Sequence, residues 1–387
     1  MNPCRISFTG DLLCSRVLQA RCALPGGGHD FSPLFRRAAP VFADSGFVVV
    51  NLESPVAGES FGFTSERYRF NTPEAFVRDA RGLLRANLVT LANNHCMDRG
   101  EAGLDATLAN LRALGLDTLG AYRTPEERDR VYVRSIAGVR VAFLNYTYGT
   151  NAFAHHVFLP EGHGWRVNLT QPEETLEGAI HLLDPMERIQ ERTGELYGKD
   201  GRSPVPVVAP FLERMRRDIE AARAEADVVI FCLHSGGQYN PDPDAYTRML
   251  MDRIRDWGAD LVVGLHPHIL QRCEARGDAP PDIYCLGNLL CMPSLCTENK
   301  WGVDCSFNAA LHVEVDPARR CLSRLSFSLL RIVEPEGGIP FVADAFDLCA
   351  EGALDPALAL RYANRFAGAD RYDAVQREYP LYQRNDE

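Results

Sequence analysis

Side chains that could bind a metal ion follow a short apolar run in the second half of the chain. His266 and His268 come directly after Leu261–Leu265, with Pro267 between them. Because a proline favours an extended conformation at the residue before it, and alternate residues of an extended chain face the same side, both imidazoles should point the same way. They would then lie within roughly 7 Å of each other, close enough to bind one metal ion or two adjacent ones. Taken alone, the pair could also be two histidines of a polar loop.

The same arrangement recurs at the ends of other apolar runs. The residues that follow these runs are acids, amides and imidazoles, namely Asp11, Glu53, Asn94, His95 and His234. Carboxylate and imidazole ligands hold divalent ions while leaving a coordination position open. Gly287 and Asn288 are interpreted as turn formers. Polar caps at strand ends would explain Asn51 or Asn93. Such caps would not explain histidines that arrive from three separate runs, so the joint pattern predicts a metal centre.

The intervening segments predict the fold that brings these residues together. Apolar runs alternate with segments of helical periodicity, which indicates an α/β fold with mostly parallel inner strands. In such folds, ligands bind beyond the carboxyl ends of the strands. Helices are expected near residues 32–43, 98–114, 213–226, 246–257 and 356–366. A further helix is expected with Thr72 as its N-cap and Pro73 in its first position. Antiparallel strands at 309–315 and 322–332 would close the sheet.

Composition excludes some classes of partner. The 387 residues carry 41 lysines and arginines against 52 aspartates and glutamates, for a formal net charge of −11. Without a basic field, nucleic acid and an anionic membrane surface are not expected as partners. Several of the 12 cysteines, such as Cys232 and Cys285, lie inside apolar runs, which favours buried thiols over a zinc ribbon. The amino terminus lacks the apolar segment of a signal peptide or membrane anchor, so a cytoplasmic location is expected.

The periodicity also predicts how the chain is divided. Residues 1–335 are expected to form one domain, on which residues 336–387 pack as a carboxyl-terminal extension. Residues 151–210 break the periodicity and are interpreted as an insertion or lid that folds over the metal centre. Its arginines, Arg166 and Arg192 among them, could meet a substrate anion, although a solvated surface would explain each of them singly.

Several short motifs occur in a fixed order along the chain. They are Gly10-Asp11, Asn51-Leu52-Glu53, Asn93-Asn94-His95 with Asp98 and Gly100, Tyr146 to Asn151, His234 with Gly236, Gly264 with His266 and His268, and Leu286-Gly287-Asn288. In this order and spacing, the set resembles the bacterial capsule-synthesis CapA family, also called PgsA-type poly-γ-glutamate synthesis proteins, over roughly residues 5–330. That family in turn resembles the calcineurin-like metallophosphoesterases. The resemblance implies a two-sheet α/β sandwich around a two-metal centre.

The resemblance also implies a role for each residue of the candidate centre. The implied metal ligands are Asp11, Glu53, Asn94, His234, His266 and His268. Glu53 would bridge two ions, and His95 would protonate the leaving group with Asp98 as its acidic partner. The implied substrate contacts are Arg16, Asn151 and Gln238. The implied cofactor is one or two divalent metal ions, of Mn, Zn or Fe.

Three features depart from the family pattern. The phosphoesterase motif Asp-x-His reads here as Asp11-Leu12-Leu13, so one metal position lacks an imidazole, and Arg16 nearby would disfavour a second cation. Gln238 replaces the carboxylate of the family's His-Trp-Gly-x-Glu-Tyr motif. PgsA-type proteins usually carry a membrane anchor, and none is expected here.

Three functions fit these residues. The first is a metal-dependent hydrolase that cleaves a phosphoester or an amide or γ-glutamyl-type bond in an anionic substrate, either a small molecule or an oligomer. The second is a non-hydrolytic component of poly-γ-glutamate or capsule synthesis that uses the site to bind a polyanion. The third is a tailoring enzyme of small-molecule or peptide biosynthesis. Turnover separates the first from the second, and the sequence leaves an oligomeric assembly open.

Overall fold

Two β-sheets form the framework of the protein. The computed structural model describes residues 2–65, 68–173, 208–296 and 302–384. The larger sheet has the strand order β14 (Phe341–Asp344), β13 (Cys321–Val333), β12 (Phe307–Asp316), β1 (Asn2–Leu12), β2 (Ser45–Leu52), β3 (Leu88–Thr90) and β4 (Asp117–Leu119), and β11 (Asn288–Leu290) and β15 (Tyr379–Gln383) pair with β1 and β13. The smaller sheet has the order β5 (Tyr132–Ile136), β6 (Val139–Thr147), β7 (Val228–His234) and β8 (Leu261–Leu265). A separate hairpin joins β9 (Glu274–Arg276) to β10 (Ala279–Asp282).

The inner strands of both sheets are mostly parallel, as the alternation of strands and helices predicts. In the larger sheet β1 to β4 run parallel to one another, and β11 is parallel to β1. In the smaller sheet β6, β7 and β8 are parallel. Antiparallel strands extend both sheets, with β12 to β15 on the β1 side of the larger sheet and β5 at one edge of the smaller sheet. The carboxyl ends of the parallel strands therefore provide a common edge for ligands.

Both faces of each sheet are covered, which explains the continuous apolar run of residues 47–50 in β2. Phe47 and Val49 of β2 join the core between the two sheets, whereas Val48 and Val50 join the core beneath the helices on the other face. Successive side chains of a strand point to opposite faces, so a strand buried on both sides has no polar alternation. The result is an α/β sandwich with two central sheets.

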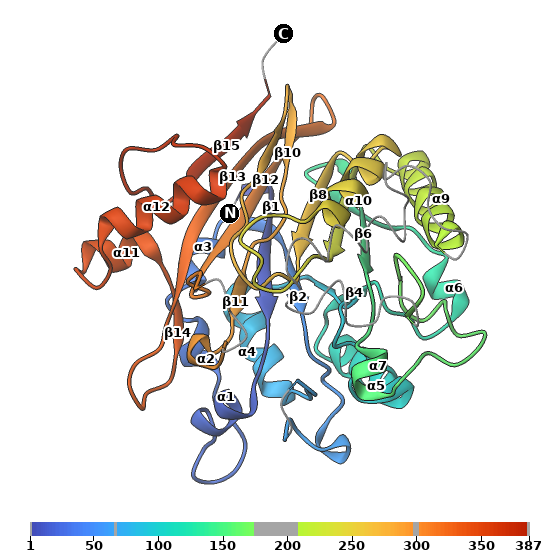
Figure 1. The fold of residues 1–387 in the computed structure, drawn as a ribbon, viewed down its shortest axis with the longest axis horizontal. Helices are drawn as coiled ribbons and strands as arrows, with labels where there is room; N and C mark the ends of the chain where they lie inside the picture. The colour runs from blue at the N-terminus through green and yellow to red at the C-terminus, as the bar shows by residue number, and fades with distance from the viewer. Residues whose placement is uncertain (1, 66–67, 174–207, 297–301, 385–387) are drawn as a thin grey trace.

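Helices cover the outer faces. On the larger sheet these are α1 (Arg16–Arg21), α2 (Ser32–Phe35), α3 (Ala39–Phe42), α4 (Glu74–Leu84) and α5 (Gly100–Ala113). On the smaller sheet they are α9 (Ala209–Glu225) and α10 (Ala245–Asp256), which lie beside β6 to β8 in Figure 1. Short helical segments connect the layers, namely α6 (Pro125–Arg128), α7 (Ala152–His155), η1 (Glu59–Phe61) and η3 (Pro293–Leu295).

The last fifty residues complete the larger sheet. Besides β14 and β15 they form α11 (Ala345–Ala350) and α12 (Pro356–Ala367), which lie beside β13 in Figure 1. Tyr362 of α12 stacks on Phe307 with ring centroids 4.0 Å apart, and Phe366 contacts Phe327 edge-on at 4.7 Å. These contacts join the tail to the core between the sheets. In the described parts of the chain, no helix is long and apolar enough to span a membrane.

Two expectations about helices are wrong. The helix expected at 32–43 is divided into α2 and α3, and Pro40 stands at the start of α3, where its missing N–H is tolerated. The N-cap of α4 is Pro73, with no side-chain cap. Thr72 makes a buried hydrogen bond of 2.7 Å to Ser54 instead, so tertiary contact overrides the local capping preference.

Candidate metal centre

Five parallel strands deliver acids, amides and imidazoles to one buried point between the two sheets. Asp11 lies at the end of β1, Glu53 follows β2 and Asn94 follows the loop after β3. From the smaller sheet, His234 ends β7, and His266 and His268 follow β8. The structure therefore brings together all six residues that the resemblance implies as ligands. All six are at most 5% exposed, so their polar atoms are shielded from bulk water.

The ligand atoms form two sets that share one carboxylate. In the first set, Glu53, His234 and His266 each offer an atom within 4.8 Å of the others. In the second set, Asp11, Glu53 and His268 do the same. A carboxylate that belongs to both sets could bind two adjacent ions.

The first set is closely packed. The Nε2 atom of His234 lies 3.4 Å from Glu53 Oε1 and 3.2 Å from His266 Nδ1. The same nitrogen lies 2.8 Å from Asn94 Oδ1, which adds an amide oxygen to the group. Two imidazole nitrogens, a carboxylate and an amide oxygen are ligands of the type that Mn, Zn and Fe accept.

The second set is held in place by asparagines. His268 Nε2 lies 3.6 Å from Glu53 Oε1, and its Nδ1 lies 3.4 Å from Asp11 Oδ2 and 2.9 Å from Asn288 Oδ1. Asn51 donates a hydrogen bond of 2.7 Å to Asp11 Oδ1. In the sheet, Asp11 is paired with Asn51 on one side and Asn288 on the other.

Asn51 and Asn288, which were expected to be a strand cap and a turn former, instead contact Asp11 and His268 of the centre. Asn288 begins β11, and its Nδ2 donates to the backbone carbonyl of His268 at 3.1 Å while its oxygen faces the ring. Such contacts fix the orientation of a metal-binding imidazole. The only signal available from the sequence was that Asn51 and Asn288 also follow or begin apolar runs.

The electrostatics of the centre fit a bound cation. Glu53 is fully buried, yet neither carboxylate oxygen accepts a hydrogen bond from any residue that the structure describes. A buried charge without such partners is costly, and a coordinated ion removes that cost.

Burial raises the pKa of Asp11, but its contacts with His268 and His234 outweigh burial and lower the pKa overall. Burial lowers the pKa of His268, but Glu53 and Asp11 raise it to about 9. The carboxylates thus draw positive charge to this point.

The extended conformation expected around Pro267 is wrong. Strand β8 ends at Leu265, and His266 and His268 have φ angles of 99° and 61°. Positive φ is unfavourable for residues with a Cβ atom and is found mainly where surrounding contacts enforce it. Here the backbone N–H of His266 donates to Asp11 Oδ2 at 3.1 Å. The two rings still lie close together, with centroids 5.6 Å apart.

A glycine beside Asp11 allows the strand ends to approach each other. A Cβ atom at Gly10 would lie 2.0 Å from the carbonyl oxygen of Gly287. We expect Gly10→Ala to push β1 from β11, to lower stability by about 1–3 kcal/mol and to weaken metal binding although no ligand is removed. Thermal unfolding and metal titration would measure both effects. Gly26→Ala is the control, because a Cβ there meets nothing within 4 Å. Unchanged metal affinity in Gly10→Ala would contradict this explanation.

His95 lies beside the centre with Asp98 behind it. His95 Nδ1 is 2.9 Å from Asp98 Oδ2, and the same carboxylate oxygen accepts a 2.6 Å hydrogen bond from the backbone of Phe70. Burial lowers the pKa of His95, but the charge and hydrogen bond of Asp98 outweigh burial and raise it overall. His155, which the sequence analysis did not single out, lies with its Nε2 3.6 Å from Asp98 Oδ1. His95, Asp98 and His155 form a third group of metal-ligand type next to the first two.

The residues expected to contact substrate lie around the same point. Asn151 accepts a hydrogen bond of 3.3 Å from Asn94, and its Nδ2 is 3.4 Å from His95 Nδ1. Arg16 and Gln238 line a cavity of about 440 Å³ that also reaches His95 and His268.

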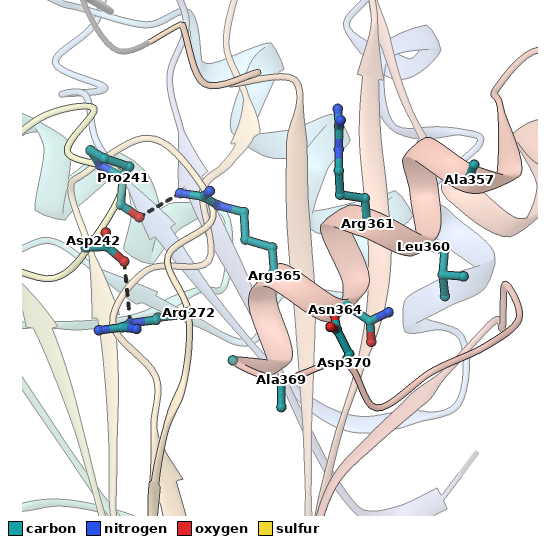
Figure 2. Close-up of a pocket in the computed structure, with 11 residues that line it drawn as sticks. Pro241, Asp242, Arg272, Ala357, Leu360, Arg361, Asn364, Arg365, Ala369 and Asp370 are labelled. Carbon is teal, nitrogen blue, oxygen red and sulfur yellow. Dashed lines mark hydrogen bonds and ion pairs between the residues drawn. The ribbon is translucent and has the colours of Figure 1, made fainter.

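A second cavity, of about 660 Å³, lies between α12 and the loop after β7. Figure 2 shows that Arg365 donates to the carbonyl of Pro241 there and that Arg272 pairs with Asp242. This second cavity contains no ligand of the centre.

The segment interpreted as a lid is described only in part. Residues 174–207, with Arg192, lie outside the described residues. Within the described part, Asn151 reaches the centre, but Arg166 pairs with Glu101 and Asp105 of α5 at 2.7 Å each. Those ion pairs satisfy the guanidinium on the helix, so the anion contact suggested for Arg166 is not supported.

Comparisons with known proteins identify the family. Residues 5–292 match the family model described as bacterial capsule synthesis protein PGA_cap. The PGA biosynthesis protein CapA of Bacillus subtilis (strain 168) is 24% identical over 286 residues, which cover 73% of this chain and 62% of that protein. The capsule biosynthesis protein CapA of Bacillus anthracis is 26% identical over 288 residues, which cover 74% of this chain and 59% of that protein. The chain is thus similar to less than two thirds of each relative's length, and it belongs to the PGA_cap family of bacterial capsule synthesis proteins.

Proposed function

We propose that the protein is a metal-dependent hydrolase that cleaves a phosphoester or an amide or γ-glutamyl-type bond in an anionic substrate. The observation that carries the proposal is the position of Glu53, which belongs to two ligand sets and whose buried oxygens accept no hydrogen bond from the described residues. Divalent ions held there would polarise the scissile group and make a water molecule nucleophilic near neutral pH.

The protein's own residues would hold and orient the reacting groups. His234, His266 and Asn94 would bind one ion with Glu53, and Asp11 and His268 would bind the other. Asn288 and Asn51 would orient His268 and Asp11 through their hydrogen bonds. Because Asp11 is followed by Leu12 and Leu13 in place of an imidazole ligand, we expect the second position to bind its ion more weakly.

His95 is the proposed general acid. Its Nδ1 is held by Asp98, so the ring presents Nε2 as the atom that can give a proton to a leaving group. The ring lines the same cavity as His268 and belongs to neither of the two sets that share Glu53, so we expect it to reach the leaving group without binding an ion. Asn151, Arg16 and Gln238 would position the substrate around it. We also propose that residues 151–210 cover the centre, with Asn151 as the contact in the described part.

The names of the two Bacillus relatives favour a second candidate, a non-hydrolytic role in capsule or poly-γ-glutamate synthesis. Turnover distinguishes the two functions. The test is to load the purified protein with Mn, Zn or Fe and assay phosphomonoester, phosphodiester and γ-glutamyl substrates with and without a chelator. We expect hydrolysis of at least one class that a chelator abolishes. Tight binding of a polyglutamate chain without turnover of any class would favour the second function.

A further inference from the structure

The cavity of about 440 Å³ has a buried polar floor and an apolar rim. His95 and His268 form the floor and are 4% and 5% exposed. Tyr68 and Leu295 at the rim are 44% and 43% exposed. Four large hydrophobic side chains are exposed among the described residues, and the other two, Leu24 and Phe158, do not line this cavity. Half of the exposed large apolar side chains are therefore gathered where a substrate would enter.

The walls between rim and floor are also mainly apolar. Their apolar members are Leu13, Val17, Phe70, Tyr239 and Met292. Aromatic rings and a flexible methionine provide a surface for a flat or branched apolar group. The volume lies within the range of about 300–1,000 Å³ that is typical of small-molecule sites.

Away from the metal centre, the described residues that line the cavity include few charged side chains. Arg16 is the only lysine or arginine among the described lining residues, and those residues include no aspartate or glutamate. Arg16 is exposed, and it makes no ion pair with any residue in the described parts of the chain. A repeating polyanion would need repeated cations along its path, whereas a single guanidinium suits a single anionic group.

We infer that the substrate is a small amphipathic anion with three parts. Its scissile group lies at the metal centre, its aromatic or branched apolar body packs between Tyr68, Leu295 and Tyr239, and one carboxylate or phosphate-type group faces Arg16. This inference rests on the proposed function, because it takes the scissile group to be held at the floor of the cavity.

Non-hydrolysable phosphonates test the inference without relying on turnover. The phosphonate binds the metal-loaded centre through hard oxygen atoms, and the rest of each probe samples the cavity. The probes are 3-hydroxypropylphosphonate, phenylphosphonate, and two carboxylates, 4-phosphonobenzoate and its longer homologue 3-(4-phosphonophenyl)propanoate. Calorimetric titration should give phenylphosphonate at least about tenfold higher affinity than the hydroxypropyl probe. The tighter of the two carboxylates should bind about three- to fivefold more tightly than phenylphosphonate, as expected for an exposed ion pair with Arg16.

Substitutions at the rim should remove these preferences selectively. Arg16→Met should bring the affinity ratio of the better carboxylate to phenylphosphonate close to one, and Leu295→Ser with Tyr68→Ser should reduce the preference for phenyl over hydroxypropyl. Matched controls are Arg361→Met in the second cavity and Leu24→Ser on the surface, which should keep both ratios. All five positions are exposed, so thermal unfolding should show folded variants.

The outcomes separate the inference from the proposed function. Equal affinity for the hydroxypropyl and phenyl probes would overturn the inference while leaving a metal centre that binds phosphonate. A γ-linked glutamate tetramer that binds more tightly than every aromatic probe would also overturn it, because that ligand is polyanionic and lacks an apolar body. If no phosphonate binds the metal-loaded protein, the proposed centre itself fails, and the inference fails with it.

Discussion

Replacing Glu53 by glutamine should remove most of the bound metal and, with it, hydrolysis. Both ligand sets use this carboxylate, so its neutral isostere weakens both at once. Replacing residues that merely support a ligand typically costs about 10- to 100-fold in metal affinity, so the loss of a shared ligand should exceed about 100-fold. Elemental analysis after dialysis and a metal titration would measure the change.

The stability of the same variant gives an independent readout. Metal that binds only the folded protein raises the midpoint of thermal unfolding, so this metal-dependent increase should be lost in Glu53→Gln. A purely structural role for Glu53 predicts instead that added metal raises the midpoint of the variant as much as that of the unaltered protein. Glu59→Gln is the matched control, since Glu59 is an exposed acid in η1 that should affect neither quantity. Full metal content in Glu53→Gln would remove the basis of the two-set assignment.

His95→Asn should separate proton transfer from metal binding. Because His95 belongs to neither of the two sets that share Glu53, metal content should remain nearly intact. Turnover should fall by about 10²- to 10⁴-fold, the usual contribution of a positioned general acid, and the basic limb of the pH–rate profile should disappear. His268→Asn should instead lower metal content and turnover together, since His268 lies 3.6 Å from Glu53 and 3.4 Å from Asp11.

A second histidine serves as the control for this comparison. His163 is half-exposed and contacts Glu101 on α5, away from the centre, so His163→Asn should retain full turnover. Full activity of His95→Asn on the best substrate would show that His95 is not the acid. In that case the His95–Asp98 contact would be structural, and the polyanion-binding function would gain support.

The arrangement of the strands could be predicted because it depends on residue periodicity. The central residues of β2 and β7 are apolar and buried, and the polar residues at the carboxyl ends of such parallel strands emerge at one edge of the sheet. The same logic predicts that Glu53 and His234 lie together, and His234 Nε2 is 3.4 Å from Glu53 Oε1. It also identified the inner strands as parallel, since helical segments intervene between them.

The features that the sequence did not predict depend on contacts between distant segments. The positive φ angles of His266 and His268 arise where β8 meets Asp11 of the other sheet, and local preference before Pro267 gives no hint of them. Asn288 looked like a turn former because its partner, the ring of His268, is 20 residues away. Thr72 was expected to cap α4, but Ser54 competes for its hydroxyl.

The most direct test of the metal centre is anomalous diffraction from crystals of the manganese-loaded protein. We predict an anomalous peak within coordination distance of oxygen and nitrogen atoms of Glu53, His234 and His266. A second, weaker peak should lie between Glu53, Asp11 and His268. Absence of any peak at Glu53 in crystals that bind manganese elsewhere would contradict the account.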